Sequence, residues 1–182
     1  AISDFDISYE SEDDFHASVS IDGKVTAIKV GNTNIKVSSN GIVDKVPVEV
    51  VPVYNTYPTP IIDWNKSRSS IISSNGQPDA ENDDVIGYEG YSTKAPMVMY
   101  MFDSNDRLES TAVMVKSIYS SELGSYIAER FQFVAEQDGI ILSADALEPS
   151  QMEMAVAVSL YDLNYWMVIY MPYTSSGLKS SE

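Results

Sequence analysis

The sequence contains no cysteine and only one histidine, His16. Without thiols, the chain cannot form disulfide bonds, use a cysteine nucleophile or bind a metal through thiolates. A serine nucleophile needs a histidine base and an orienting acid beside it, and no nucleophile-elbow motif accompanies His16. We therefore interpret His16 as an ordinary surface histidine rather than a catalytic base.

Basic residues are also scarce, because 11 lysines and arginines stand against 27 acidic residues, for a formal net charge of −16. A strongly negative surface repels phosphate groups, so neither nucleic acid nor anionic lipid is expected as a partner. No apolar run reaches the roughly 18–20 residues that a membrane-spanning helix needs. Any membrane attachment is expected to come from an N-terminal lipid anchor outside this sequence.

Short segments of alternating apolar and polar residues dominate residues 1–53. In the clearest segment, residues 20–37, Asp22 and Gly23 separate two alternating runs. An Asp-Gly pair in this setting is the strongest local signal for a β-hairpin. Pro47 lies in the last alternating run. Because proline donates no hydrogen bond to a ladder, that strand is expected either to lie at a sheet edge or to turn the Pro47 nitrogen toward solvent. Residues 1–53 are therefore predicted to form an all-β module.

Residues 7–39 resemble the second half of a bacterial Ig-like domain, group 2. The resemblance rests on Tyr9-Glu10-Ser11, on the strand around residues 17–21, on DGKVTA at residues 22–27 and on residues 30–36. The first two strands of that family have no counterpart here, so the Ig-like module is expected to be incomplete. The resemblance implies an extracytoplasmic spacer.

The rest of the chain is predicted to form a second, α+β domain. Three of the eight prolines lie in residues 51–60, so residues 54–60 are predicted to be a stiff linker before a domain at 61–174 and a flexible tail at 175–182. Helical spacing predicts helices at 64–74, with Asp63 as N-cap, and at 121–135. Alternation predicts strands at 84–89, 95–102, 107–116, 139–143, 151–161 and 165–171. The expected fold is an antiparallel sheet with both helices on one face.

This order, one helix and three strands occurring twice, indicates an internal duplication over residues 64–117 and 121–172. The alternative is a chance match of two weak patterns. The αβββ repeat resembles the tandem repeat of β-lactamase inhibitor proteins in architecture only. Residues 126–131 (YIAERF) and 166–172 (WMVIYMP) also resemble uncharacterised secreted lipoproteins of Gram-negative anaerobes.

Acidic residues suggest a metal or glycosidase site only weakly. The loops at 10–14 and 79–84 supply oxygen ligands of the kind that calcium prefers, but the second lacks the spacing of an EF-hand. With 27 acids, no pair of carboxylates can be singled out for glycoside hydrolysis. Both loops are interpreted as solvated turns, and no metal, cofactor or catalytic residue is predicted. The protein is expected not to be an enzyme.

Alternation places methionines and aromatic residues on opposite faces of the predicted sheet. In residues 97–102, the three methionines face one way, and Val98, Tyr100 and Phe102 face the other. Because helices can cover only one face, the helix-free face is predicted to be an interaction surface, with Tyr100, Trp166 and Tyr170 as its binding residues. The alternative is that these residues are core.

Together, these features predict a non-catalytic binding or adhesion protein of the cell surface or periplasm, anchored to the outer membrane or secreted. The Ig-like module would be a spacer, and the α+β domain would bind a protein or a glycan. Two alternatives stay open. One is a proteinaceous inhibitor of a secreted or periplasmic enzyme, and the other is a glycan-binding module that stacks sugars on tyrosine and tryptophan rings.

Overall fold

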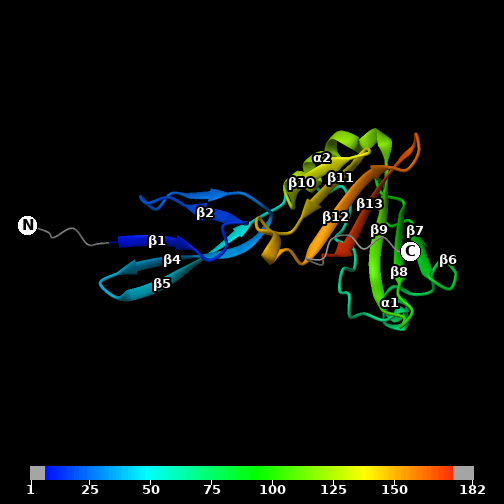
Figure 1. The fold of residues 1–182 in the computed structure, drawn as a ribbon, viewed down its shortest axis with the longest axis horizontal. Helices are drawn as coiled ribbons and strands as arrows, with labels where there is room; N and C mark the ends of the chain where they lie inside the picture. The colour runs from blue at the N-terminus through cyan, green and yellow to red at the C-terminus, as the bar shows by residue number, and fades with distance from the viewer. Residues whose placement is uncertain (1–6, 174–182) are drawn as a thin grey trace, which may run out of the picture. The chain divides into compact units, whose positions relative to one another are not determined.

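A computed structural model describes residues 7–173, which form two compact units (Figure 1). Within that range, the first unit contains the residues up to Val53 together with residues 128–130, and the second contains the others. The tail predicted at 175–182 lies outside the described residues. Among the described residues, neither helix has the length and apolar character needed to cross a membrane.

The first unit is built from five described strands in two small antiparallel sheets. β1 (Ile7–Ser11), β4 (Gly31–Ser39) and β5 (Ile42–Val50) pair in the order β1-β4-β5, and β2 (Ala17–Val19) pairs with β3 (Val25–Ala27). The predicted hairpin at Asp22-Gly23 is confirmed, since it joins β2 to β3 and Gly23 has a φ of +81° that glycine adopts without steric cost. Strand β5 lies at a sheet edge, as Pro47 predicts.

The inner face of the larger sheet in this unit is only partly covered. Ile35 on β4 is 3% exposed, whereas its neighbour Val46 on β5 is 49% exposed and Ile42 on the same face is 74% exposed. Phe15 and Ala17 are also buried. A sandwich that buries one sheet against another needs comparable strands on both sides, and β2 and β3 have only three residues each.

The second unit is one eight-stranded antiparallel sheet with two helices, in the order β10-β11-β12-β13-β9-β8-β7-β6. Its first half contains α1 (Arg68–Asn75), β6 (Ala80–Glu81), β7 (Val85–Glu89), β8 (Met97–Phe102) and β9 (Leu108–Lys116). Its second half contains α2 (Ser120–Ala128), β10 (Gln132–Gln137), β11 (Ile140–Ala144), β12 (Met154–Leu160) and β13 (Tyr165–Pro172). Short 3₁₀ turns occur at Ser117–Tyr119 and Pro149–Gln151.

Both predicted helices are shorter than expected. The first begins at Arg68, because Ser67 rather than Asp63 caps it by accepting a hydrogen bond from the Ser70 amide. The second ends at Ala128, and residues 132–137 form strand β10 instead. Residues 138 and 139 are a second Asp-Gly turn, with φ of +53° and +78°, and this turn pairs β10 with β11. Each helix is therefore followed by four strands, not three.

The sheet order has a symmetric pattern, in which β6 to β9 and β10 to β13 each run from one edge of the sheet inward to the central β9–β13 pair. The turns that join β8 to β9 and β12 to β13 are alike. Asp103 accepts hydrogen bonds from the amides of Asn105 and Arg107 at 2.9 and 2.8 Å, and Asp162 accepts from those of Asn164 and Tyr165 at 2.7 and 2.9 Å. An internal duplication is a natural explanation of this likeness, and it stays a prediction.

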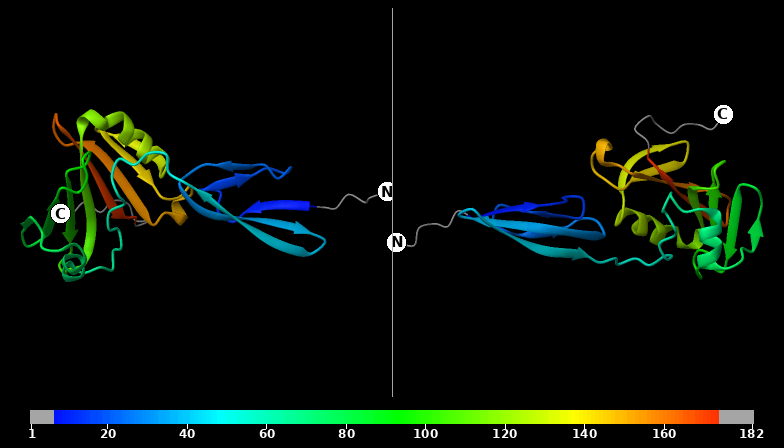
Figure 2. Two further views of the ribbon diagram at one scale, coloured as in Figure 1. Left: turned by 180° about the vertical axis from the view of Figure 1, so that it is seen from behind. Right: turned by 90° about the horizontal axis from the view of Figure 1, so that it is seen from below.

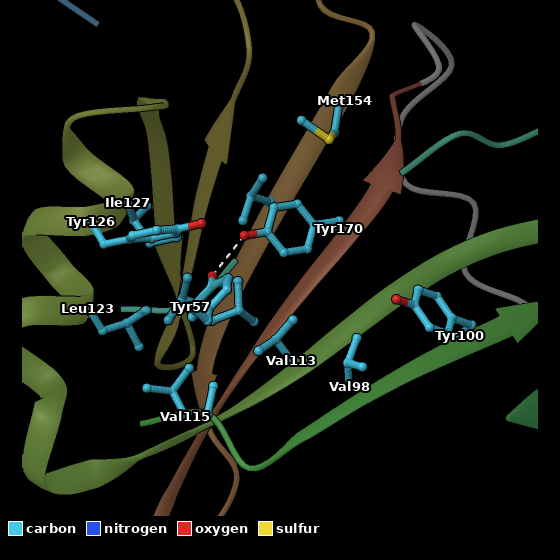
Figure 3. Close-up of a cluster of buried hydrophobic side chains, with 14 of the residues drawn as sticks. Tyr57, Val98, Tyr100, Val113, Val115, Leu123, Tyr126, Ile127, Met154 and Tyr170 are labelled. Carbon is cyan, nitrogen blue, oxygen red and sulfur yellow. Dashed lines mark hydrogen bonds between the residues drawn. The ribbon is translucent and has the colours of Figure 1, made fainter. Parts of the chain in front are cut away.

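One core fills the space between the two helices and a single face of the sheet. Figure 2 shows the helices and strands from two further sides, and Figure 3 shows the part of the core beside α2. Ile71 of α1 and the inward side chains of α2 pack on the same side of the strands. The buried hydrophobic residues of the four central strands on this face are Val98, Tyr100, Phe102, Leu108, Val113, Val115, Met154, Val156, Val158, Val168 and Tyr170. Tyr57 from the segment before α1 enters the same core, where its hydroxyl lies 2.7 Å from that of Tyr170 (Figure 3).

Candidate interaction surface

The three aromatic residues predicted for the helix-free face lie on the helix-covered face instead. Tyr100 and Tyr170 are each 2% exposed and belong to the core, and Trp166 is half-buried against it. The alternation along the strands was assigned correctly, but the face that the helices cover was not. Both faces of these strands are apolar, so alternation alone does not show which face the helices take.

The helix-free face is therefore the one that carries the methionines. Met97 on β8 is paired with Met114 on β9, and Met114 is paired with Met167 on β13. In the next row, Met99 on β8 is paired with Ala112 on β9, and Ala112 is paired with Ile169 on β13. Six of the eight methionines lie on this face, and we call them the methionine face: Met97, Met99, Met101, Met114, Met167 and Met171.

The methionine face is apolar, partly accessible and uncharged at its centre. All six methionines are partly exposed, and between them lie small residues such as Ala112 and Ala157. Charged side chains on this side occur at its borders, at Glu89, Lys116 and Glu153. Methionine is flexible and polarizable, and the centres of protein interfaces are enriched in methionine and depleted of charge. This composition suits contact with a protein surface.

Hydrogen peroxide should distinguish the two faces of the sheet. We expect the methionine face to oxidise several-fold faster than Met154, because Met154 is 9% exposed and packs in the core. Peptide mass spectrometry after brief peroxide treatment measures each site separately. In urea the difference should vanish, and equal rates in the folded protein would contradict the assignment of faces.

Most of the first unit is similar to a known protein family. Residues 2–50 match the family model of the bacterial Ig-like domain (group 2). Domains of this family are typical of bacterial surface proteins. No curated protein and no solved structure has significant similarity to the chain. The resemblance to β-lactamase inhibitor proteins has no support from these comparisons, and the methionine face lies outside the matched residues.

Within the first unit, His16 has a packing role. Its ring contacts that of Phe15 at 5.2 Å between centroids, and Asp13 lies 3.7 Å from its Nε2 atom. A Cβ atom at Gly31, where φ is +146°, would come within 2.2 Å of the His16 ring. The histidine is thus half-buried against backbone, and the prediction of an ordinary surface position was wrong.

The acidic loop at 10–14 of the first unit is tied to the strands of that unit by ion pairs. The Glu12 carboxylate accepts a hydrogen bond from Asn34 at 2.8 Å and lies 2.5 Å from the Lys45 ammonium. The hydrogen bonds from Lys45 and Asn34 hold the pKa of Glu12 below its ordinary value. These contacts hold the loop against strands β4 and β5.

The second acidic loop, at 79–84, is organised by Arg68 of α1. The Arg68 guanidinium donates hydrogen bonds to the carbonyl oxygens of Asn82 and Asp83 and to the Asp106 carboxylate, and lies 4.6 Å from the centroid of the Phe102 ring. In residues 7–173, no group of three histidine, aspartate or glutamate side chains is placed to hold a metal ion. The hydrogen bonds from Arg68 therefore hold this loop against α1.

A pocket of about 300 Å³ lies between residues 55–58 and residues 92–94 of the second unit. Its lining residues are Asn55, Thr56, Tyr57, Pro58, Ser92, Thr93 and Lys94. The Lys94 ammonium is 2.5 Å from the Glu122 carboxylate, which also accepts a hydrogen bond from the Thr56 hydroxyl. The hydrogen bond from Lys94 lowers the pKa of Glu122. Because Glu122 neutralises Lys94, the pocket has no unpaired cation for an anionic ligand.

Proposed function

We propose that this protein is a non-catalytic, extracytoplasmic binding or adhesion protein. In this proposal, the bacterial Ig-like module is a spacer, and the α+β unit binds a protein partner through its methionine face. The observation that carries the proposal is the uncharged, partly exposed row of methionines on the sheet face opposite both helices. The location at the cell surface or in the periplasm draws on the family match of residues 2–50, and attachment through a lipid anchor belongs to the proposal.

A protein partner suits this surface better than a glycan. Glycan-binding surfaces stack sugars on exposed aromatic rings, but Tyr100 and Tyr170 are buried and Trp166 packs toward the helices. A proteinaceous inhibitor of a secreted enzyme is a special case of the same proposal, because its target would also be a protein. Identification of the partner as a hydrolase would establish that case.

A photo-crosslinking amino acid at Met99 tests the proposal in cells that produce the protein. We expect one dominant protein adduct, and Ile169→Asp should reduce its yield at least about tenfold, because a charge in the middle of the methionine face removes apolar contact. The same crosslinker at Asn105, in the exposed β8–β9 turn, is the matched control. The proposal fails if Met99 yields no specific adduct, or if folded Ile169→Asp crosslinks as well as the wild type.

A further inference from the structure

We propose that Met97, Met114 and Met167 form a binding site for a soft monovalent metal ion, Cu(I) or Ag(I). The three residues occupy one row across adjacent strands, since Met97 lies opposite Met114 and Met114 lies opposite Met167. All three point away from the helices, because their neighbours Val98, Val113 and Val168 are buried on the helix-covered face.

The row brings three thioether sulfurs within reach of one ion. Directly opposed residues in antiparallel strands have Cβ atoms about 4.5–5.5 Å apart. A methionine side chain has three rotatable bonds beyond its Cα atom, so the two outer sulfurs can turn toward the central Met114 without backbone movement. Met99 lies on the same face, diagonal to Met114, within the range from which a long side chain can add a fourth sulfur.

The available donors favour a soft ion. Thioethers select Cu(I), whereas carboxylates and carbonyls suit hard ions such as Mg²⁺ and Ca²⁺. The chain has no cysteine, so methionine is its main soft ligand. All three residues are partly exposed, so an ion in solution can approach this row. The net charge of −16 also raises the local concentration of cations.

Silver(I) in chloride-free buffer is the probe, because it avoids the oxidation chemistry of copper. The experiment uses the full chain with ¹³C-labelled methionine methyl groups. We expect the methyl resonances of Met97, Met114 and Met167 to shift and to saturate with a single silver ion per chain. Those of Met152, Met154 and Met171 should stay in place. No protein partner takes part, so this result is independent of the proposed binding function.

Two leucine variants provide the decisive comparison. Met114→Leu removes the central sulfur with little change in volume and should weaken silver binding at least about tenfold. Met171→Leu is the matched control, because Met171 lies on the same face of β13 but is paired with Ala155, and it should bind as the wild type does. The site does not exist if binding is not saturable, if all methionines shift equally, or if both variants bind alike.

Discussion

Replacing Tyr170 with alanine should lower the free energy of unfolding of the second unit by about 3–5 kcal/mol. The Tyr170 side chain is 2% exposed, its ring lies 6.1 Å from that of Phe131, and its hydroxyl pairs with that of Tyr57 at 2.7 Å. Alanine would leave a cavity between α2 and the sheet that the surrounding side chains can only partly fill. Urea unfolding followed by circular dichroism measures the loss.

The control for this variant is Tyr170→Phe, which keeps the ring and removes only the hydroxyl. Its expected cost is about 1 kcal/mol, because it removes one buried hydrogen-bonding group. The sequence alone had placed Tyr170 among binding residues, where alanine would weaken partner binding and leave stability unchanged. Weaker partner binding of Tyr170→Ala with unchanged stability would show that Tyr170 is not part of the core.

The stability of the second unit should fall steeply above about pH 10. Burial raises the pKa values of Tyr57 and Tyr170 well above that of an ordinary tyrosine. Above pH 10 the unfolded chain therefore releases protons that the folded chain keeps, so the unfolded state is favoured as the pH rises. The stabilisation is fully present below the ordinary tyrosine pKa. Each of the two tyrosines contributes a loss of about 1.4 kcal/mol per pH unit in this range.

Urea midpoints between about pH 9 and pH 12 measure this effect. The double variant Tyr57→Phe/Tyr170→Phe should have a flatter alkaline limb, because two of the groups that couple folding to proton release are gone. Tyr161 is 63% exposed and lies outside the core, so Tyr161→Phe provides the matched control. An unchanged slope in the double variant would mean that Tyr57 and Tyr170 do not stay protonated in the folded state.

Two kinds of local sequence pattern, the Asp-Gly turn and helical spacing, gave different results in this protein. Asp-Gly pairs begin hairpins at residues 22–23 and 138–139, and in both places the glycine has a positive φ. The first was predicted. The second was overlooked because Phe131 and Val134 continue the helical spacing of α2, and this spacing favoured a helix to residue 135. Pairing of β10 with β11 outweighed that weak helical preference, since strand formation depends on a partner that a local window does not contain.

The sequence by itself determined the division into a β-module and an α+β unit, the alternation of side chains along each strand, and the exclusion of thiol chemistry. These features depend on local turn chemistry, on the period of two in a strand and on composition. The resemblance found in residues 7–39 agrees with the family match over residues 2–50.

Only the tertiary structure decided which face of the sheet receives the helices, and with it the candidate surface. In residues 97–102, both faces are apolar, so burial against α1 and α2 could satisfy either one. The choice depends on contacts with residues far along the chain, such as Tyr57 with Tyr170, and on the register that aligns Met97, Met114 and Met167 in one row. Alternation is a local property, but the register of the strands and the choice of the face that the helices cover are set by long-range packing. This packing places Tyr100 and Tyr170 in the core and the methionine face at the surface.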